Sequence, residues 1–363
     1  MFNQIIGLGN AGSQIVREIA NNADFHNVKL YAIDSVASNV DIKTSIDIDY
    51  ICTISDESQG SGRDRERGAA MYCMHESKGD FDQMYLNAME AKSPVIVISS
   101  AAGGTGSGSI VPLCKKLVED DIDVIPIIIY PNDADPTAYH LNATDLLIEL
   151  GEINVSTYSI FVNPANTVDY TNINHEVVDL IEIILGMKYK YTKSDSIDDS
   201  DLNSILAVPG RFIAFSAKAP DAAHMKKELT RKLYSGYQPA WSDKEANTYT
   251  FVKAFSLVSM FATTDYDEVF SDIRSRIPNA LDEYKNAVND NNDGTMEATV
   301  IVAGLPRHNV KIIDSKFNEV DGIADGMKRS TRPKFMNRKK KTFTKSDAPT
   351  DNKEKLENIK WDD

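Results

Sequence analysis

The chain has 363 residues, of which 42% are apolar and 26% are charged, the proportions of a globular protein long enough for two domains. No apolar run approaches the roughly 20 residues of a membrane span, and the N-terminus lacks the features of a secretion signal, so we expect a cytoplasmic protein. Its three scattered cysteines exclude a disulfide framework and a zinc site, and the formal net charge of −15 disfavours nucleic acid or acidic membranes as ligands of the main body.

Apolar runs alternate with helical patterns through the first 172 residues. Continuous apolar strands that alternate with amphipathic helices are typical of a parallel sheet covered on both faces. The strands that we predict are NQIIGLG, KLYAID, PVIVISS, DVIPIIIYP and TYSIFVNP. The pattern therefore predicts an α/β fold that begins with a Rossmann-like, nucleotide-binding domain over residues 1–172.

The remaining residues predict four further parts. A core helix over residues 173–192 is apolar on too many sides for a surface helix, so protein should cover it. Residues 193–306 alternate strand and helix patterns and predict a smaller mixed α/β domain that starts with an acidic loop. A C-terminal helix follows over 307–330, and residues 331–363 read as a flexible, polar tail.

A first glycine loop follows the first predicted strand. Gly7, Gly9 and Gly12 form the pattern G-x-G-x-x-G ahead of a helix, which by itself suggests a dinucleotide site. In that interpretation the protein is an NAD-dependent oxidoreductase, and Asp34, at the end of the second strand, holds a ribose. The alternative structural interpretation is a glycine turn needed only for tight packing of strand and helix.

A second glycine loop, AAGGTGSGS, lies between a later strand and a helix at residues 101–109. Unpaired N–H groups at a helix N-terminus favour a phosphate, glycine lets the backbone approach it, and Thr105, Ser107 and Ser109 add hydroxyl groups. No lysine follows either glycine loop, so the loops are not of Walker type. Two such loops together favour phosphate binding over a role in packing alone.

The motif AGGTGSG at residues 102–108 resembles the tubulin and FtsZ superfamily of GTPases, and the resemblance extends in element order over about residues 3–325. It implies a cytoskeletal hydrolase that binds GTP or GDP with Mg²⁺ and polymerises head to tail. GNAGSQIV at 9–16 is similar to the first tubulin loop, and QGSGRDRERGAA at 59–70 is similar to the loop that senses the γ-phosphate, although it lacks the usual Asn-Pro.

The resemblance also implies roles for single residues. Gln14 takes the place of a glutamine near the phosphates and magnesium, Asp135 that of the ribose ligand, and Asn163 and Asn174 those of residues that read the guanine edge. Val36 stands where FtsZ has an acidic residue. No protein ligand to the metal is assigned. The implied nucleotide-binding residues are Gly9, Asn10, Ala11, Gly12, Gln14, Asp34, Ser35, Gly60, Gly62, Ala102, Gly103, Gly104, Thr105, Gly106, Ser107, Asp135, Asn163 and Asn174.

The acidic segment SDSIDDSDLNSIL at 194–206 resembles the family's N-x-D-x-x-D loop, which reaches the γ-phosphate bound by the neighbouring subunit. Asp198 and Asp201 keep the spacing of the carboxylates, and Ser196 replaces the asparagine. Hydrolysis needs a polarised water in line with the γ-phosphate. The resemblance therefore implies that Asp198 and Asp201 are catalytic in a site shared between subunits. The alternative is a solvated acidic loop.

Nine basic residues and no acidic one occupy residues 328–345, with Phe335 and Phe343 among them. Such a segment suits an anionic partner, either nucleic acid, an acidic protein or an anionic membrane leaflet, unless it only adds solubility. The tail is most like the plasmid and phage branch of the family, TubZ and phage tubulins. That likeness implies a tail, 328–363, that captures a DNA-bound, centromere-binding adaptor for plasmid segregation or phage DNA positioning in the cytoplasm of a bacterial host.

Two other functions remain open within the family. One is an FtsZ-like GTPase of cell division, and the other is a scaffold that assembles without hydrolysis.

Overall fold

A computed structural model gives the fold of the chain, which divides into two compact units, Met1–Asn318 and Glu319–Asp363. All residues that the structure describes lie in the first unit. They are residues 4–39, 48–54, 60–91, 93–132, 135–153, 155–161, 170–185, 199–237, 254–259, 263–276, 282–287 and 296–305. No helix in this part of the chain is both long and apolar enough to cross a membrane.

The strands form one ten-stranded sheet in the order β3-β2-β1-β4-β5-β6-β7-β10-β8-β9. Its first six strands are parallel to one another, as predicted for five of them, and β3 was not predicted. Their order is that of a doubly wound nucleotide-binding sheet. These strands are β1 (Gln4–Leu8), β2 (Lys29–Asp34), β3 (Tyr50–Thr53), β4 (Val95–Ser100), β5 (Val124–Tyr130) and β6 (Ser156–Phe161).

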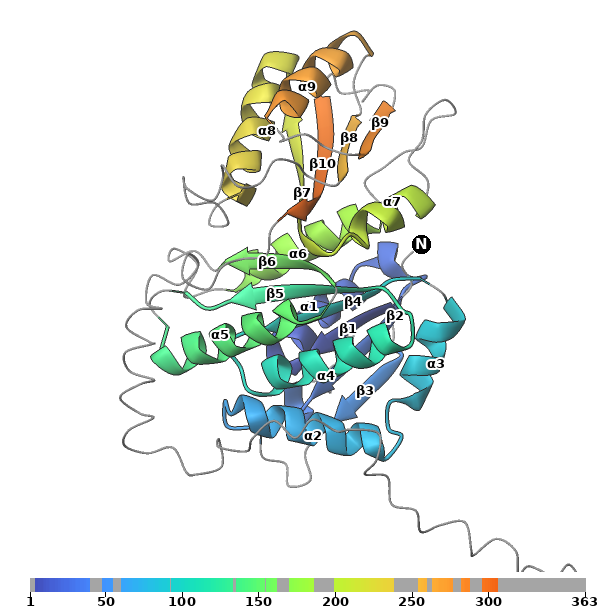
Figure 1. Ribbon diagram of the computed structural model, residues 1–363, viewed down its shortest axis with the longest axis vertical. Helices are drawn as coiled ribbons and strands as arrows, with labels where there is room; N and C mark the ends of the chain where they lie inside the picture. Colours follow the sequence, from blue (N-terminus) through green and yellow to red (C-terminus); the bar gives the residue numbers. More distant parts are fainter. Residues whose placement is uncertain are drawn as a thin grey trace, which may run out of the picture. The chain divides into compact units, whose positions relative to one another are not determined.

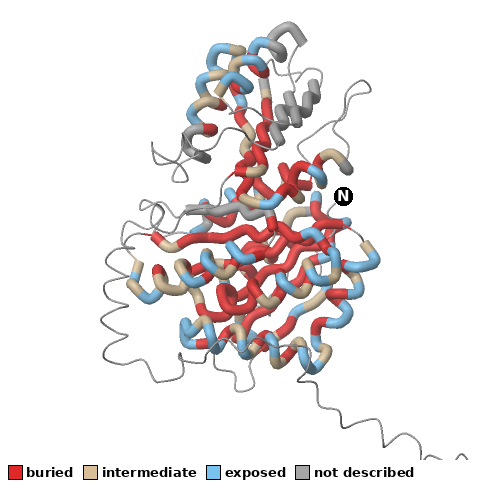
Figure 2. The backbone as a smooth tube through the Cα atoms, in the orientation of Figure 1, coloured by how far each residue is buried: buried red, intermediate tan, exposed pale blue. Residues whose placement is uncertain are grey.

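Helices cover both faces of this parallel sheet, and Figure 1 shows α4 and α5 in front of the strands. Along β1, Ile5 packs into one core with α1 and α6, and its neighbour Ile6 packs into a second core with α2 to α5. Alternating side chains point to opposite faces of the sheet, so both faces must be covered. Each buried isoleucine contributes about 1.5–3 kcal/mol to the free energy of folding. Figure 2 shows β1, β4 and β5 as almost wholly buried. The helices are α1 (Gly9–Ala20), α2 (Arg65–Ser77), α3 (Asp82–Ala91), α4 (Thr105–Glu119), α5 (Thr137–Gly151) and α6 (Thr171–Ile184).

The later strands extend the sheet from β6. β7 pairs with β6 through only two residue pairs, Ser156 with Gly210 and Thr157 with Arg211. β10 is antiparallel to both β7 and β8. A third core, under α8 and α9, includes Leu229 and Val269. These elements are α7 (Asp199–Leu206), β7 (Gly210–Ala219), α8 (Ala222–Tyr237), β8 (Ala254–Ser259), α9 (Thr263–Ser275), β9 (Asp282–Ala287) and β10 (Met296–Leu305).

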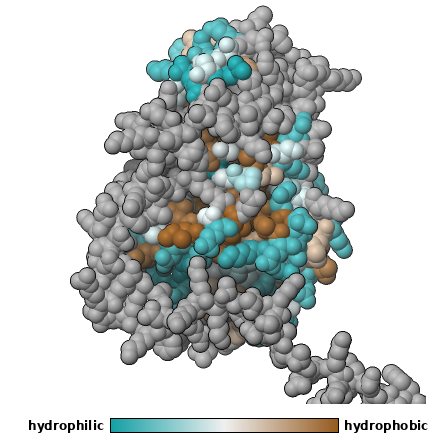
Figure 3. All heavy atoms as spheres, viewed as in Figure 1, coloured by the Kyte–Doolittle hydropathy of each residue, from teal (hydrophilic) through white to brown (hydrophobic). Residues whose placement is uncertain are grey.

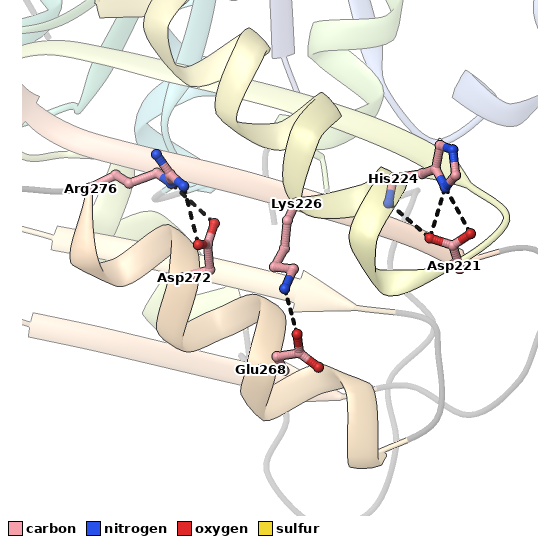
Figure 4. Close-up of polar contacts among 6 residues, drawn as sticks. All are labelled: Asp221, His224, Lys226, Glu268, Asp272 and Arg276. Atoms are coloured by element: carbon pink, nitrogen blue, oxygen red, sulfur yellow. Dashed lines mark hydrogen bonds and ion pairs between the residues drawn. The ribbon is translucent and has the colours of Figure 1, made fainter.

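Polar contacts join α8 and α9 on the solvent side (Figure 4). Lys226 Nζ lies 2.5 Å from Glu268 Oε1, and the Asp221 carboxylate accepts a hydrogen bond of 2.9 Å from the backbone N–H of His224 at the start of α8. Exposed ion pairs of this kind contribute little to stability, because water and salt screen them. Figure 3 shows a hydrophilic surface at the top of the view, where these helices lie. The apolar core beneath them therefore holds the helices in place.

Three predictions from the sequence were wrong or incomplete in detail. The predicted loop over 59–70 contains the start of α2, because the Asp64 carboxylate accepts from the N–H of Arg67 and caps a helix. The predicted acidic loop contains α7, whose Leu202, Ile205 and Leu206 are buried at helical spacing. The polar edge strand β9 was not predicted, because its sequence, DEYKNA, gives little strand signal.

Other predictions fall outside the described residues. The core helix was predicted to extend to residue 192. In the structure α6 ends at Ile184, and residues 186–192 lie outside the described part of the chain. The predicted helix over 307–330 and the tail from 331 lie outside the described part of the chain.

Candidate functional site

A cavity of about 510 Å³ opens at the carboxyl ends of the parallel strands. Leu8 at the end of β1, Ser100 at the end of β4 and Tyr130 at the end of β5 all line it. β1 lies between β2 and β4, so the chain reverses its direction across the sheet at this point. Open α/β sheets bind their ligands at such a reversal. Of the predicted residues, those that line the cavity are Gly9, Asn10, Ala11, Gln14, Asp34, Ser35, Gly60, Gly62, Ala102, Gly103, Gly104, Thr105, Gly106, Asp135 and Asn174.

The N-termini of α1 and α4 both face this cavity. Neither helix has a side-chain cap, and neither carries an acidic residue in its first turn. By contrast, α2 is capped by Asp64 and has Glu66 in its first turn. Uncapped N-termini present unpaired N–H groups and a partial positive charge, which favour an anion. This pair of helix ends therefore fits a ligand with several phosphates.

Close packing of the two glycine loops builds the floor of the cavity. Gly9 has φ of +69°, and a Cβ there would lie 2.8 Å from the backbone nitrogen of Gly106. A Cβ on Gly106 would in turn lie 2.7 Å from the carbonyl oxygen of Leu8. Gly103 differs, because a Cβ there would meet no atom within 4 Å. Its backbone therefore lies open to a ligand, while the other two glycines allow the loops to touch.

Three hydroxyl groups join the walls of the cavity. Thr105 Oγ1 lies 2.6 Å from Ser35 Oγ and 3.0 Å from Ser61 Oγ, so the loop after β2, the loop before α2 and the start of α4 meet at one point. Asp34 holds the loop of Ser35 in place, because its carboxylate accepts hydrogen bonds from the N–H of Ser35 at 2.6 Å and from Asn39 Nδ2 at 2.7 Å.

Asp34 is only 2% exposed. Removal from water raises the pKa of Asp34 above its ordinary value, and the hydrogen bonds from Asn39 and Ser35 offset part of that rise. Both carboxylate oxygens of Asp34 thus accept hydrogen bonds from the loop that follows β2. This arrangement suits a supporting role for Ser35 better than the capture of a ribose hydroxyl that the dinucleotide interpretation requires.

Aromatic and polar side chains also line the cavity. Tyr139 on α5 and Tyr170 before α6 line it, and Tyr170 remains 48% exposed. Asp135 is held by the N–H of Asn132, which donates to its Oδ2 at 2.7 Å. Asn174 on α6 donates from Nδ2 to Glu18 Oε1 at 2.8 Å. The lining therefore fits a ligand that carries both phosphates and a planar, polar ring.

The sequence matches no model of a protein family and no curated protein. Solved structures do match, at low identity. CetZ1 of Haloferax volcanii, solved as a GDP-bound monomer, is 18% identical with a TM-score of 0.66, over 90% of this chain and 100% of that one. A GTPγS-form protofilament of TubZ from Bacillus thuringiensis serovar israelensis is 16% identical with a TM-score of 0.69, over 90% and 94%. An FtsZ dimer of M. jannaschii is 16% identical with a TM-score of 0.62, over 84% and 88%. The chain has the fold of the tubulin and FtsZ superfamily.

Within this tubulin/FtsZ fold, two of the predicted nucleotide ligands lie away from the cavity. A Cβ on Gly12 would collide with the carbonyl oxygen of Ile98, so this glycine lets α1 pack against β1 and β4. Ser107 is fully buried, and its hydroxyl donates to the carbonyl oxygen of Gly103. Both residues are absent from the lining of the cavity, and their contact with a nucleotide stays a prediction.

Of the three remaining predicted site residues, the structure describes one. Asp201 lies on α7 and does not line the cavity of its own chain. Asn163 and Asp198 lie outside the described residues.

Arg63 is a cavity residue that the sequence predictions missed. It has φ of +66°, and its guanidinium carbon lies 5.0 Å from the centre of the Tyr139 ring. Asn142 on α5 fixes its backbone, donating from Nδ2 to the carbonyl oxygens of Arg63 at 3.1 Å and Ala102 at 2.9 Å. An arginine inside a glycine-rich loop signals anion binding, and Arg63 could have been chosen on that ground; Asn142 has no such signal.

We expect Arg63→Gly to weaken binding of GTPγS by about tenfold and that of GDP by less, because a guanidinium near the phosphates gains most from the extra charge. Glycine tolerates the positive φ, so the loop keeps its shape. Titration with the two nucleotides measures the effect, and Arg67→Ala, an exposed arginine outside the cavity, is the control. Equal losses for both nucleotides would contradict a phosphate contact.

Proposed function

We propose that this protein is a GTPase that polymerises head to tail into filaments. The observation that carries the proposal is the meeting of two uncapped helix N-termini at one cavity within a tubulin/FtsZ fold. The GDP of the CetZ1 structure and the GTPγS of the TubZ protofilament support guanine nucleotide as the ligand. The protofilament and the FtsZ dimer support self-assembly.

Phosphate binding falls to the N–H groups at the starts of α1 and α4 and to the loop of Ser61 and Arg63. Within the described residues, no three His, Cys, Asp or Glu side chains converge on a point that could hold a metal ion. Mg²⁺ is often coordinated mainly by the phosphates of its nucleotide, with few protein ligands. The side-chain oxygens of Gln14 and Thr105, which line the cavity, fit the role of such ligands. When bound, it would neutralise charge on the phosphates.

The path of the chain separates Asp201 from the cavity of its own subunit. α6 begins at the cavity with Ile173 and Asn174 and is 14 residues long, which corresponds to about 21 Å. β7 follows α7, and its first residue, Gly210, pairs with Ser156 at the start of β6. That start lies at the amino edge of the parallel sheet. In Figure 1 the arrowhead of β5 points away from the side on which α7 lies.

A carboxylate at the amino edge suits a phosphate held at the carboxyl edge of another subunit. We therefore infer that Asp201, together with Asp198, polarises the attacking water in the cavity of the next subunit. A contact between unlike faces that does not close on itself produces an open filament. Hydrolysis would then depend on assembly.

For the biological role, we propose segregation or positioning of plasmid or phage DNA, with the basic tail 328–363 as the contact to a DNA-bound adaptor. TubZ among the similar structures supports this branch, and CetZ and FtsZ are matched at similar scores. A role in cell division is the alternative. Binding of a 328–363 peptide to a centromere-protein complex favours segregation, and binding to division proteins favours the alternative.

The proposed activity is tested by adding GTP and Mg²⁺ to the full chain at a series of protein concentrations. Light scattering and phosphate release should both rise steeply above a critical concentration, because neither subunit alone holds the whole site. NADH is the control ligand, and fluorescence of bound NADH would favour an oxidoreductase instead. Scattering without phosphate release would indicate a scaffold that does not hydrolyse GTP.

A further inference from the structure

A single hydrogen bond between α1 and α6 determines which atom Asn174 can offer to a ligand. Asn174 is 8% exposed and lines the cavity. Its Nδ2 donates to Glu18 Oε1 at 2.8 Å. Both helices are held by the same apolar core, which includes Ile15 and Ile19 of α1 and Val177 of α6. The two side chains therefore meet in a rigid seam.

The hydrogen bond between Glu18 and Asn174 can run in only one direction. A carboxylate accepts hydrogen bonds and donates none, whereas an amide has a donor end and an acceptor end. Glu18 must therefore face the NH₂ group of Asn174. No donor among the described residues reaches Asn174 Oδ1, and this oxygen is not among the buried polar atoms without a partner. It is thus the polar atom of Asn174 left to the cavity.

We propose that Glu18 is a positioning residue that selects the base of the nucleotide. By holding the nitrogen of Asn174, it presents an acceptor to the ligand. Guanine carries two adjacent donors, the ring N1–H and the 2-amino group, which a carbonyl oxygen can accept. Xanthine has a carbonyl oxygen in place of that amino group, and the two oxygens would repel each other. This inference rests on the proposed function, because it assigns a base to the same cavity.

The test compares binding of GDP and XDP, measured by titration of the full chain. We expect the wild-type chain to prefer GDP. In Glu18→Gln the neighbouring side chain can donate as well as accept, so Asn174 can turn its nitrogen to the ligand. The preference for GDP over XDP should fall by about tenfold or more, the effect of a misdirected buried amide. The shape of the seam is kept, because glutamine and glutamate have the same size.

A second variant restores the direction with the opposite partners. In Glu18→Gln combined with Asn174→Asp, the glutamine donates to the new carboxylate, which again presents an acceptor to the base. The preference for GDP should return. Glu182→Gln is the matched control, because Glu182 accepts from Asn22 Nδ2 at 3.4 Å in the same α1–α6 region and does not line the cavity. It should leave the preference unchanged.

Each result decides the matter. A lower GDP preference in Glu18→Gln that the double variant restores supports the inference. An equal loss of affinity for both nucleotides, or an unchanged ratio, would show that Glu18 acts only in packing and would overturn it. A wild-type chain that binds GDP and XDP equally well overturns the inference and leaves the GTPase proposal standing. A wild-type chain that binds neither nucleotide overturns the proposed function and this inference with it.

Discussion

Replacing Gly103 by valine should abolish nucleotide binding without unfolding the protein. A Cβ at this position meets no protein atom within 4 Å, and the residue lines the cavity beside the start of α4. The added methyl groups would therefore occupy the space in which we place the phosphates, and the core would be unaffected. Nucleotide titration and urea unfolding, carried out on the same protein, separate the two effects.

Gly108→Val, five residues along the same glycine-rich stretch, should do the opposite. A Cβ on Gly108 would lie 2.6 Å from the backbone nitrogen of Ala69 and would also collide with the carbonyl oxygen of Arg65. α2 would be pushed away from α4, at a cost of about 1–3 kcal/mol or more. If Gly103→Val lowered the unfolding midpoint as much as Gly108→Val, the assignment of Gly103 to the ligand would fail.

Asp201→Ala should slow GTP turnover in assembled protein by roughly a hundredfold or more and leave GTP binding intact. The side chain does not line the cavity of its own chain, so binding to a dilute monomer should not change. Phosphate release per assembled subunit measures the loss. Asp199→Ala is the control, because Asp199 lies on the same helix but outside the predicted carboxylate spacing.

Mixing two inactive variants tests whether the site is shared. Asp201→Ala binds nucleotide and lacks the carboxylate, whereas Gly103→Val supplies the carboxylate and binds no nucleotide. If one subunit completes the site of the next, the mixture should regain part of the activity that each variant lacks. A mixture with no recovery, together with full turnover by wild-type monomer below the critical concentration, would place all the chemistry in one subunit.

The apolar strands and both glycine loops could be predicted from the sequence because their signals are local. A strand buried on both faces is a continuous apolar run, as in PVIVISS, and this property predicted the parallel half of the sheet. Each loop lies directly between such a run and a helix. Topology alone then brings the loops together, since the carboxyl ends of neighbouring parallel strands meet at one edge.

Residues that act through contacts between distant segments could not be predicted in this way. α2 packs on α4 at Gly68, where a Cβ would collide with the carbonyl oxygen of Gly104. A contact made by a glycine leaves no apolar pattern in the sequence. Asn142 lies within a helix, and only the fold shows that it reaches two loops. For the same reason the sequence did not show that Gly12 and Ser107 pack against the protein interior.

The bond from Asn142 to two loops also restricts how a ligand can leave. The carbonyls of Arg63 and Ala102 accept hydrogen bonds from one side chain, so the two loops form one stiff wall of the cavity. Tyr170, which also lines the cavity, is 48% exposed. A ligand held against this wall would then be released by one joint movement of both loops and not by either loop alone.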